Sequence, residues 1–190
     1  MCGRFSFSPL AKIIEDRFDV KVDSHYKPRF NSAPSQNLAV ISNTNPGHLS
    51  YFRWGLIPFW AKDAKIGNKM INAKAETITE KPSFRNSFKR KRCLVPSDGF
   101  FEWKKIGAKE KIPYRILMKD QPFFRWQEFG IPGRTKREDL INSFTILTTA
   151  PNELMAEIHH RMPQFLEKMK RCGLTIPIRF AIKFVKPFPI

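Results

Sequence analysis

The chain begins Met1-Cys2-Gly3-Arg4, so a thiol directly follows the initiator methionine. Methionine is generally trimmed when the second residue is small, and trimming would leave Cys2 with an amine and a thiol on adjacent carbons. This pair can condense with an aldehyde, first to an imine and then to a thiazolidine ring. Both groups are usable near neutral pH, because the reference pKa is about 7.7–8.0 for an α-amine and about 8.5 for a thiol. The alternative interpretation is that Cys2 is only part of a frayed terminus.

Two further side chains are of a type that moves protons. Glu102 stands among the aromatic residues Phe100, Phe101 and Trp103. If Glu102 faces inward, desolvation raises the pKa of its carboxyl, which could then act as an acid near neutral pH. Strand alternation alone equally allows Glu102 to face water. His159 is placed by the pattern in the last turn of a helix, where an imidazolium is favoured and a structural cap is the alternative role.

The composition predicts a polyanionic partner. Thirty-four Lys and Arg residues oppose 17 Asp and Glu, which gives a formal charge of +17 and a pI near 10.1. This balance favours nucleic acid, and after it an anionic membrane surface. No apolar run is long enough to span a bilayer, and the N-terminus lacks the apolar stretch of a signal peptide. Three widely spaced cysteines indicate neither a disulfide framework nor a zinc site, so we expect a soluble protein of a reducing compartment. The chemistry expected of the aminothiol requires no metal or organic cofactor.

The pattern of elements predicts an α+β fold built mainly from short strands. A length of 190 residues suits one domain with a core of its own. We expect one helix capped by Ser8 with an apolar stripe beginning at Leu10, and another capped by Thr149 and ended by Pro163. The predicted strands lie at residues 4–7, 38–41, 49–56, 93–96, 100–103, 112–118, 123–126 and 143–148. The expected architecture is a single domain with a curved, mainly antiparallel, barrel-like sheet and a few peripheral helices.

Six segments in register resemble a known family. They are MCGRF at 1–5, APSQ at 33–36, RWGLIP at 53–58, INAKAET at 71–77, CLVPSDGFFEW at 93–103 and IHHRMP at 158–163. Together they resemble the SOS response-associated peptidase (SRAP) family of abasic-site processing proteins, over residues 1 to about 166. The resemblance implies a single α+β domain with a positively charged cleft for single-stranded DNA and for junctions of single and double strands. It also implies that the processed N-terminal cysteine forms a thiazolidine with the ring-opened aldehyde of an abasic site, which shields the lesion during replication.

The resemblance assigns roles by motif. Cys2 would be the nucleophile, Asn72 would orient the N-terminus, Glu102 would shuttle protons, and His159 would assist ring opening or closing. The implied DNA-binding residues are Gly3, Arg4, Pro34, Trp54, Lys74, Arg85, Trp103 and Arg161. Lys74 stands where the family signature has arginine, so it keeps the charge but loses the bidentate fork, and a modest loss of DNA affinity is expected.

The chain departs from the family pattern near its end. We therefore predict an SRAP-like domain at 1–167 and a divergent basic tail at 168–190 that is poorly ordered. The expected protein is a cytoplasmic monomer, nucleoid-associated if bacterial or phage, that binds DNA and no membrane. Its expected activity is lyase-like DNA–protein crosslinking. The alternatives are a thiol autopeptidase that removes Met1, and a module that binds single-stranded DNA without covalent chemistry.

Overall fold

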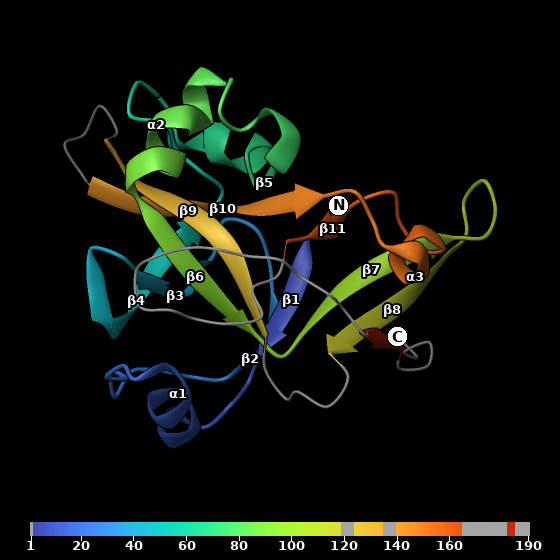
Figure 1. Ribbon diagram of the computed structural model, residues 1–190, viewed down its shortest axis with the longest axis horizontal. Coiled ribbons are helices and arrows are strands. Elements are labelled where there is room, and N and C mark those ends of the chain that lie inside the picture. The colour runs from blue at the N-terminus through green and yellow to red at the C-terminus, as the bar shows by residue number, and fades with distance from the viewer. Residues whose placement is uncertain (1, 119–123, 135–139, 165–181, 185–190) are drawn as a thin grey trace.

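Two curved sheets organise the part of the chain that the computed structural model describes, residues 2–118, 124–134, 140–164 and 182–184 (Figure 1). The strands are β1 (Arg4–Phe7), β2 (Arg29–Ser32), β3 (Asn37–Ser42), β4 (Asn45–Trp54), β5 (Asn72–Lys74), β6 (Arg92–Ser97), β7 (Gly99–Lys105), β8 (Lys111–Met118), β9 (Phe124–Arg134), β10 (Leu140–Thr149), β11 (Met162–Pro163) and β12 (Ile182–Phe184). The helices are α1 (Ala11–Phe18), α2 (Pro82–Arg90) and α3 (Glu153–Ala156), with 3-10 turns η1 (Ala64–Lys69) and η2 (Ala75–Thr77). The predicted α+β class is confirmed.

The larger sheet closes on itself. Its order is β11-β10-β4-β3-β6-β9, and β10 also pairs with β9, so these strands form a barrel with β11 as an addition. Neighbours are antiparallel except at β10, which runs parallel to both β4 and β5. The curved, mainly antiparallel sheet expected from the sequence is therefore present. Because Thr148 of β10 pairs with both β5 and β11, β10 brings these two short strands to the same region of the barrel.

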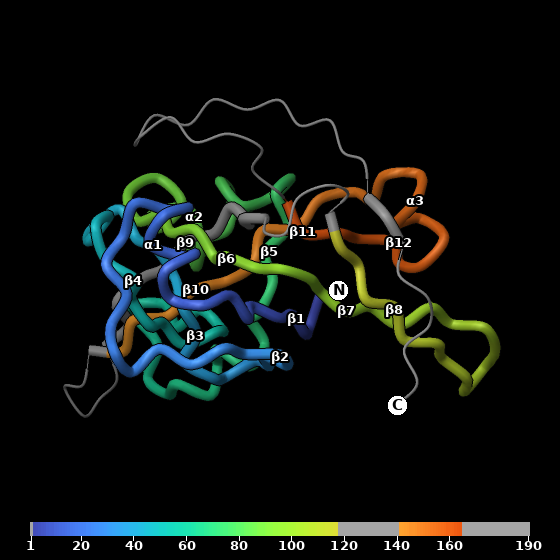
Figure 2. The backbone as a smooth tube through the Cα atoms, turned by 90° about the horizontal axis from the view of Figure 1, so that it is seen from below, coloured from blue at the N-terminus to red at the C-terminus, as the bar shows by residue number. Residues whose placement is uncertain are grey.

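The smaller sheet has the order β12-β8-β7-β1-β2. Its strand β1 pairs antiparallel with β7, Arg4 opposite Phe101 and Phe5 opposite Phe100, and with β2 on its other side. Both views place β1 between the barrel and the β7–β8 hairpin, which extends away from the barrel (Figure 1, Figure 2). The start of β1 therefore lies where the two sheets meet.

Apolar side chains fill the space between the sheets and the helices. The main cluster joins β1 to the barrel through Phe5, Trp54 and Phe144, with the rings of Trp54 and Phe144 stacked at a centroid distance of 6.3 Å. A second cluster seats α2 on the barrel, and a third seats α1 near the end of β1. The aromatic segment from Trp54 to Trp60 is divided between core and surface. Trp54 is completely buried, whereas Phe59 and Trp60 are exposed.

Both predicted helix caps are wrong. The cap of α1 is Leu10, not Ser8, and Leu10 itself is 68% exposed instead of lying in the core. The cap of α3 is Asn152, whose side chain accepts a hydrogen bond from the N–H of Met155 at 2.9 Å. The Ser–Pro and Thr–x–Pro patterns each indicated a cap two or three residues too early in the chain. In each case a residue closer to the first helical turn is the cap.

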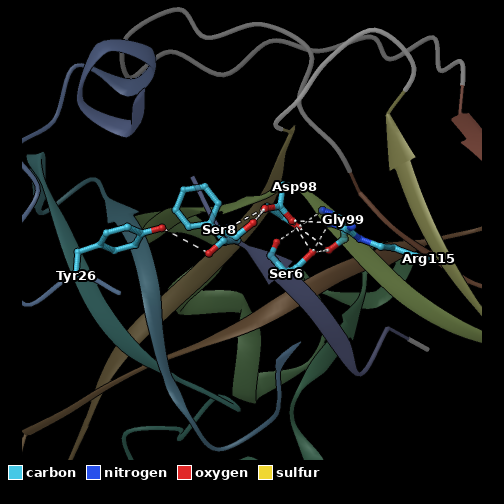
Figure 3. Close-up of polar contacts among 8 residues, drawn as sticks. Ser6, Ser8, Tyr26, Asp98, Gly99 and Arg115 are labelled. Carbon is cyan, nitrogen blue, oxygen red and sulfur yellow. Dashed lines mark hydrogen bonds and ion pairs between the residues drawn. The ribbon is translucent and has the colours of Figure 1, made fainter. Parts of the chain in front are cut away.

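Ser8 instead belongs to a polar cluster that fixes β1 on β7. Figure 3 shows Ser6, Ser8 and Arg115 converging on the carboxylate of Asp98. Asp98 accepts hydrogen bonds from the N–H and hydroxyl of Ser8 at 2.7 and 2.6 Å, and from the hydroxyl of Ser6. The guanidinium of Arg115 lies 3.3 Å away and completes the cluster from β8. Because it joins β1 and β8 to the turn between β6 and β7, this cluster helps to set the register on which the start of the chain depends.

Replacing Asp98 with alanine is expected to lower the free energy of unfolding by about 3 kcal/mol, since the change leaves hydroxyl and guanidinium donors without their shared acceptor in a largely buried site. Urea unfolding followed by circular dichroism measures the loss. Asp16→Ala is the control, because Asp16 makes only an exposed ion pair with Lys12 and should cost well under about 1 kcal/mol. Equal losses for the two variants would contradict this account of the cluster.

The predicted basic tail at 168–190 lies outside the described residues except for β12, which pairs with β8. The division near residue 167 stays a prediction. Within the described ranges, no helix is both long enough and apolar enough to cross a membrane.

Candidate active site

The start of the chain is held by Asn72. Asn72 opens β5, whose parallel pairing with β10 places it opposite Ile146. Its side-chain Nδ2 donates a hydrogen bond to the carbonyl oxygen of Cys2 at 3.0 Å. The Oδ1 atom of the same amide is buried and has no hydrogen-bond partner among residues 2–118, 124–134, 140–164 and 182–184. Asn72 thus fixes the backbone of Cys2, and its Oδ1 atom remains available to accept a hydrogen bond.

The thiol of Cys2 is enclosed. The residue is 0% exposed, and its Sγ donates to the carbonyl oxygen of Arg4 at 3.6 Å. Cys2 also belongs to the main apolar cluster, with Phe5 and Trp54. The predicted nucleophile is therefore an ordered residue at the junction of the two sheets and not part of a frayed end.

Glu102 faces inward. It lies on β7 opposite Tyr114 and follows Phe101, the partner of Arg4, so the antiparallel pairing carries it alongside the start of β1. Glu102 is 3% exposed, and this burial raises the pKa of its carboxyl, while the positive charge of the chain's amino terminus acts in the opposite direction. Of the two orientations that the sequence allowed, Glu102 therefore has the inward one, in which the carboxyl can hold a proton closer to neutral pH.

His159 is anchored through its backbone neighbour Arg161. The N–H of Arg161 donates to Nδ1 of His159 at 3.1 Å, and the carbonyl oxygen of Arg161 lies 3.2 Å from the same nitrogen. Nδ1 can therefore accept a hydrogen bond when the ring is neutral and donate one when it is protonated. Burial and the charge of the amino terminus both lower the pKa of His159, which favours the neutral ring. The helix α3 ends at Ala156, so the prediction that His159 lies in a last helical turn is wrong.

Arg161 is engaged within the protein. Its two terminal nitrogens each lie 2.8 Å from a carboxylate oxygen of Glu76, and one of them also donates to the carbonyl oxygen of Thr148 at 2.6 Å. This forked ion pair lowers the pKa of Glu76 to about 2. Arg161 therefore ties the segment of His159 to the turn after β5, and this bracing role was missed by sequence reasoning. Glu76 lies 85 positions from Arg161, and no local pattern links them.

The predicted DNA-binding residues divide into exposed and buried groups. Exposed ones are Arg4, Lys74, Arg85 and Trp103, and half-buried ones are Gly3 and Pro34. The guanidinium of Arg4 donates to Oδ1 of Asn31 at 2.8 Å, a partner that the sequence did not reveal. The exposed cations lie on β1, β5 and α2, so they could meet a phosphate backbone from outside.

Trp54 lies in the core and not at the surface. Its side chain is completely buried, which does not favour a direct contact with DNA, and that role stays a prediction. Its indole N–H donates to the carbonyl oxygen of Ile71 at 2.9 Å, one residue before Asn72. Trp54 therefore supports Asn72 from the core.

Within the described part of the chain, no group of three His, Cys, Asp or Glu side chains is arranged to hold a metal ion. What the site does contain is a thiol next to the chain terminus, an amide that holds its backbone, a buried carboxyl and a half-buried imidazole. This set can carry out nucleophilic chemistry with general acid–base assistance.

Comparisons with known proteins point in one direction. Residues 1–172 match the profile of the family described as SOS response associated peptidase (SRAP). The chain is 48% identical over 170 residues to the abasic site processing protein YoaM of Bacillus subtilis, covering 87% of this chain and 75% of that protein. It is 33% identical over 174 residues to the abasic site processing protein YedK of Escherichia coli, covering 87% and 75%. A crystal structure of a Bacteroides thetaiotaomicron protein, 34% identical, superimposes with a TM-score of 0.79 over 88% of this chain and 78% of that one.

Proposed function

Because the chain belongs to the SOS response associated peptidase (SRAP) family, we propose that it processes abasic sites in single-stranded DNA by forming a covalent link through Cys2. Relatives at up to 48% identity are named abasic site processing proteins. The observation that carries the proposal is the hydrogen bond from Asn72 to the carbonyl oxygen of Cys2, at the place where the buried Glu102 lies on the adjoining strand. This hydrogen bond holds the cysteine at a fixed position, whereas a nucleophile in a frayed terminus would have no fixed position from which to react.

The reaction requires removal of Met1, so that Cys2 carries a free amine. The amine attacks the open-chain aldehyde of the abasic sugar, and the carbonyl oxygen leaves as water when the imine forms. The thiol then adds to the imine carbon, which closes the thiazolidine. One carbon–nitrogen and one carbon–sulfur bond form, one water is released, and no oxidant, metal or organic cofactor is consumed.

Proton transfer is the contribution proposed for Glu102 and His159. An abasic sugar is mostly a closed hemiacetal, so an acid must assist ring opening and a base must take a proton from the amine. A carboxyl whose pKa is raised by burial can serve in both directions, and such assistance is worth about 10²–10⁴-fold. A neutral His159 whose Nδ1–H donates to the carbonyl oxygen of Arg161 has its Nε2 available to accept a proton. The buried Oδ1 of Asn72 is suited to accept a hydrogen bond from the amine.

DNA is proposed to lie across the exposed cations Arg4, Lys74 and Arg85, with Trp103 beside the lesion. Trp103 is 37% exposed and is the neighbour of Glu102 on β7, so its ring can cover the gap left by a missing base. Single strands are preferred in this proposal because the sugar must be reachable, and an abasic residue has no base to unstack. Phosphate contacts should make the affinity fall with salt.

The test is an intact-mass measurement with an oligonucleotide that carries one abasic site. The expected product has the mass of the chain without Met1 plus the oligonucleotide minus one water, and it survives heating in denaturant. An oligonucleotide whose abasic aldehyde has been reduced to an alcohol is the control and should give no product. A product of equal yield from the reduced oligonucleotide, or from a chain that retains Met1, would refute the thiazolidine.

Asn72→Ala is expected to slow crosslinking about tenfold, since Cys2 loses its anchor and positioning effects of this kind are costly. Single-turnover formation of the crosslinked band measures the rate. Asn43→Ala is the matched control, because Asn43 also bridges two segments, through Arg90 and Arg92, but lies outside the site. The proposal predicts an unchanged rate for Asn43→Ala even where its stability falls, and equal slowing in both variants would assign the effect to folding.

Autocatalytic removal of Met1 is a second candidate activity, favoured by the position of the thiol of Cys2 next to the bond that must break. Here Glu102 would serve as the general acid and base, and water would hydrolyse the Met1–Cys2 bond. A chain synthesised without methionine aminopeptidase tests this activity by mass. Loss of Met1 in the original chain and its retention in Glu102→Ala would support self-processing, whereas retention in both would exclude it.

A further inference from the structure

A hollow lies beside β1 and reaches Phe7, at the end of the strand farther from Cys2. It has a volume of about 330 Å³ and is bordered by β1, β2, β3, β4 and the segment before β2. Its lining residues include four apolar side chains, Phe5, Phe7, Leu38 and Pro96. Its polar and aromatic lining residues include Tyr26, Lys27, Arg29, Ser32, Asn37 and Tyr51. None of these residues has a role in the chemistry proposed for Cys2.

Ser32 contributes a buried hydroxyl to the lining of this hollow. The residue is 1% exposed, yet its hydroxyl has no hydrogen-bond partner within the described ranges. A buried hydroxyl without a partner costs free energy, so such groups usually serve a ligand or a water. Ser32 also lines the hollow, so a bound molecule that reaches the hydroxyl could supply the missing bond.

Two tyrosines supply aromatic surface. Tyr26 is fixed, because its hydroxyl donates to the carbonyl oxygen of Pro9 at 2.9 Å, and its ring meets that of Phe7 at a centroid distance of 6.2 Å (Figure 3). Tyr51 on β4 stands opposite Ala39 and is 41% exposed, so one part of its ring is available to a ligand. Because both tyrosines line the hollow, each can offer an aromatic face to a flat ligand there.

The rim is cationic. Lys27 and Arg29 are exposed at the hollow, together with His25, which is paired with Asp23. The other nearby carboxylate, Asp98, is already occupied by Ser6, Ser8 and Arg115. The hollow therefore combines a flat apolar interior, one buried polar group and positive charge at its mouth. A nucleobase with its phosphate has the complementary shape and chemistry, and a volume near 330 Å³ suits one such unit.

We propose that this hollow is a subsite for one unpaired nucleotide of single-stranded DNA, with the base between the tyrosines and the phosphate at Lys27 and Arg29. Strand β2 connects it to the reactive site, because Asn31 holds Arg4 while the next residue, Ser32, lines the hollow. The subsite therefore binds undamaged DNA on one side of the lesion. This proposal rests on the proposed function only in taking DNA as the ligand, since it requires no covalent step.

Photocrosslinking locates the bound base directly. Oligonucleotides with a single 5-iodouracil, moved one position at a time along an otherwise undamaged strand, are irradiated with the Cys2→Ser chain, and the linked peptide is identified by mass spectrometry. An abasic analogue without an aldehyde in the same strand fixes the register. The expected result is then a crosslink to Tyr51 or Tyr26 from iodouracil placed on one side of the analogue and not on the other. Crosslinks confined to other residues, or absent at every position, would overturn the subsite.

Equilibrium binding tests the energetic role. In fluorescence anisotropy with undamaged single strands, Tyr51→Ala is expected to weaken binding about tenfold, the size of one lost stacking contact. Arg29→Gln should weaken binding and reduce the slope of affinity against salt, whereas Lys109→Gln, at the exposed turn between β7 and β8, removes the same charge away from the hollow. Equal losses for Arg29→Gln and Lys109→Gln, together with unchanged binding for Tyr51→Ala, would show a general charge effect and no subsite.

The two proposals can fail separately. The absence of a crosslink between the original chain and abasic DNA refutes the covalent function, but leaves the anisotropy of the Cys2→Ser chain to decide the subsite. Conversely, crosslinking that proceeds normally while Tyr51→Ala binds as tightly as the parent refutes the subsite alone.

Discussion

Replacing Cys2 with alanine is expected to abolish the covalent product with abasic DNA. Alanine leaves a terminal amine that can still form an imine, but no sulfur remains to close the ring. An imine is hydrolysed in denaturant, so no band should survive heating. Because the phosphate contacts proposed for Arg4, Lys74 and Arg85 are untouched, binding to the same DNA should remain close to that of the original chain.

Reduction separates the two steps of this reaction. Borohydride added during incubation traps an imine, so the Cys2→Ala chain should give a stable product only in its presence. Cys93→Ala serves as the matched control, since Cys93 is a buried thiol on β6 with no terminal amine. It should crosslink as well as the original chain. A heat-stable product from Cys2→Ala without borohydride would place the nucleophile elsewhere and overturn the function proposed here.

Replacing Glu102 with glutamine is expected to slow crosslinking about 100-fold at neutral pH, within the usual range for a lost general acid or base. Glutamine keeps the shape and the hydrogen-bonding capacity of the side chain but cannot carry the proton. In the original chain the acid role weakens as the pH rises above the raised pKa of Glu102, whereas the residual rate of the variant lacks this dependence. Single-turnover rates between mildly acidic and mildly alkaline pH measure both features.

Stability provides the control for this variant. Burial raises the pKa of Glu102 in the folded chain, so its protonated form is favoured there. The contribution of the protonated Glu102 to the free energy of unfolding is fully present below the pKa of this carboxyl in the unfolded chain. It is lost as the pH rises through the higher pKa in the folded chain. A neutral glutamine avoids this loss, so Glu102→Gln should be at least as stable as the original chain at neutral pH. A slow variant that is also strongly destabilised would point to a structural role, and an unchanged rate would remove Glu102 from the mechanism.

The strands β1, β3, β4 and β6 to β10 were predictable because each shows a short apolar or alternating run between turn residues, whereas the short strands β2, β5, β11 and β12 were not predicted. The direction of Glu102 was not, since three aromatic neighbours make either face of β7 equally apolar, and only the pairing with β1 and β8 decides it. The predicted helix starts were wrong because Ser8 and Thr149 precede prolines that commonly open a helix, whereas Ser8 instead donates its hydrogen bonds to Asp98, 90 positions away.

The candidate site was predictable only where a motif carried it. Cys2, Asn72 and Glu102 stand in such motifs, and the structure joins the first two by a hydrogen bond. Trp54 lies in a motif as well, but its burial depends on stacking against Phe144 from a distant strand. The brace between Arg161 and Glu76 and the hollow around Ser32 have no local signal, because each is assembled from segments that meet only after the sheets have formed.

The closure of the barrel by β10 has a consequence for the newborn protein. Strands from the first third of the chain must wait for β10 to complete their pairing, and β10 also positions β5 and β11. Partners so distant along the chain make folding slow compared with helical proteins. On the ribosome, the cysteine emerges first, but Asn72 and His159 cannot be set around it until residues near Pro163 have been synthesised. The aminothiol is therefore expected to gain its full reactivity only when translation of the domain is nearly finished.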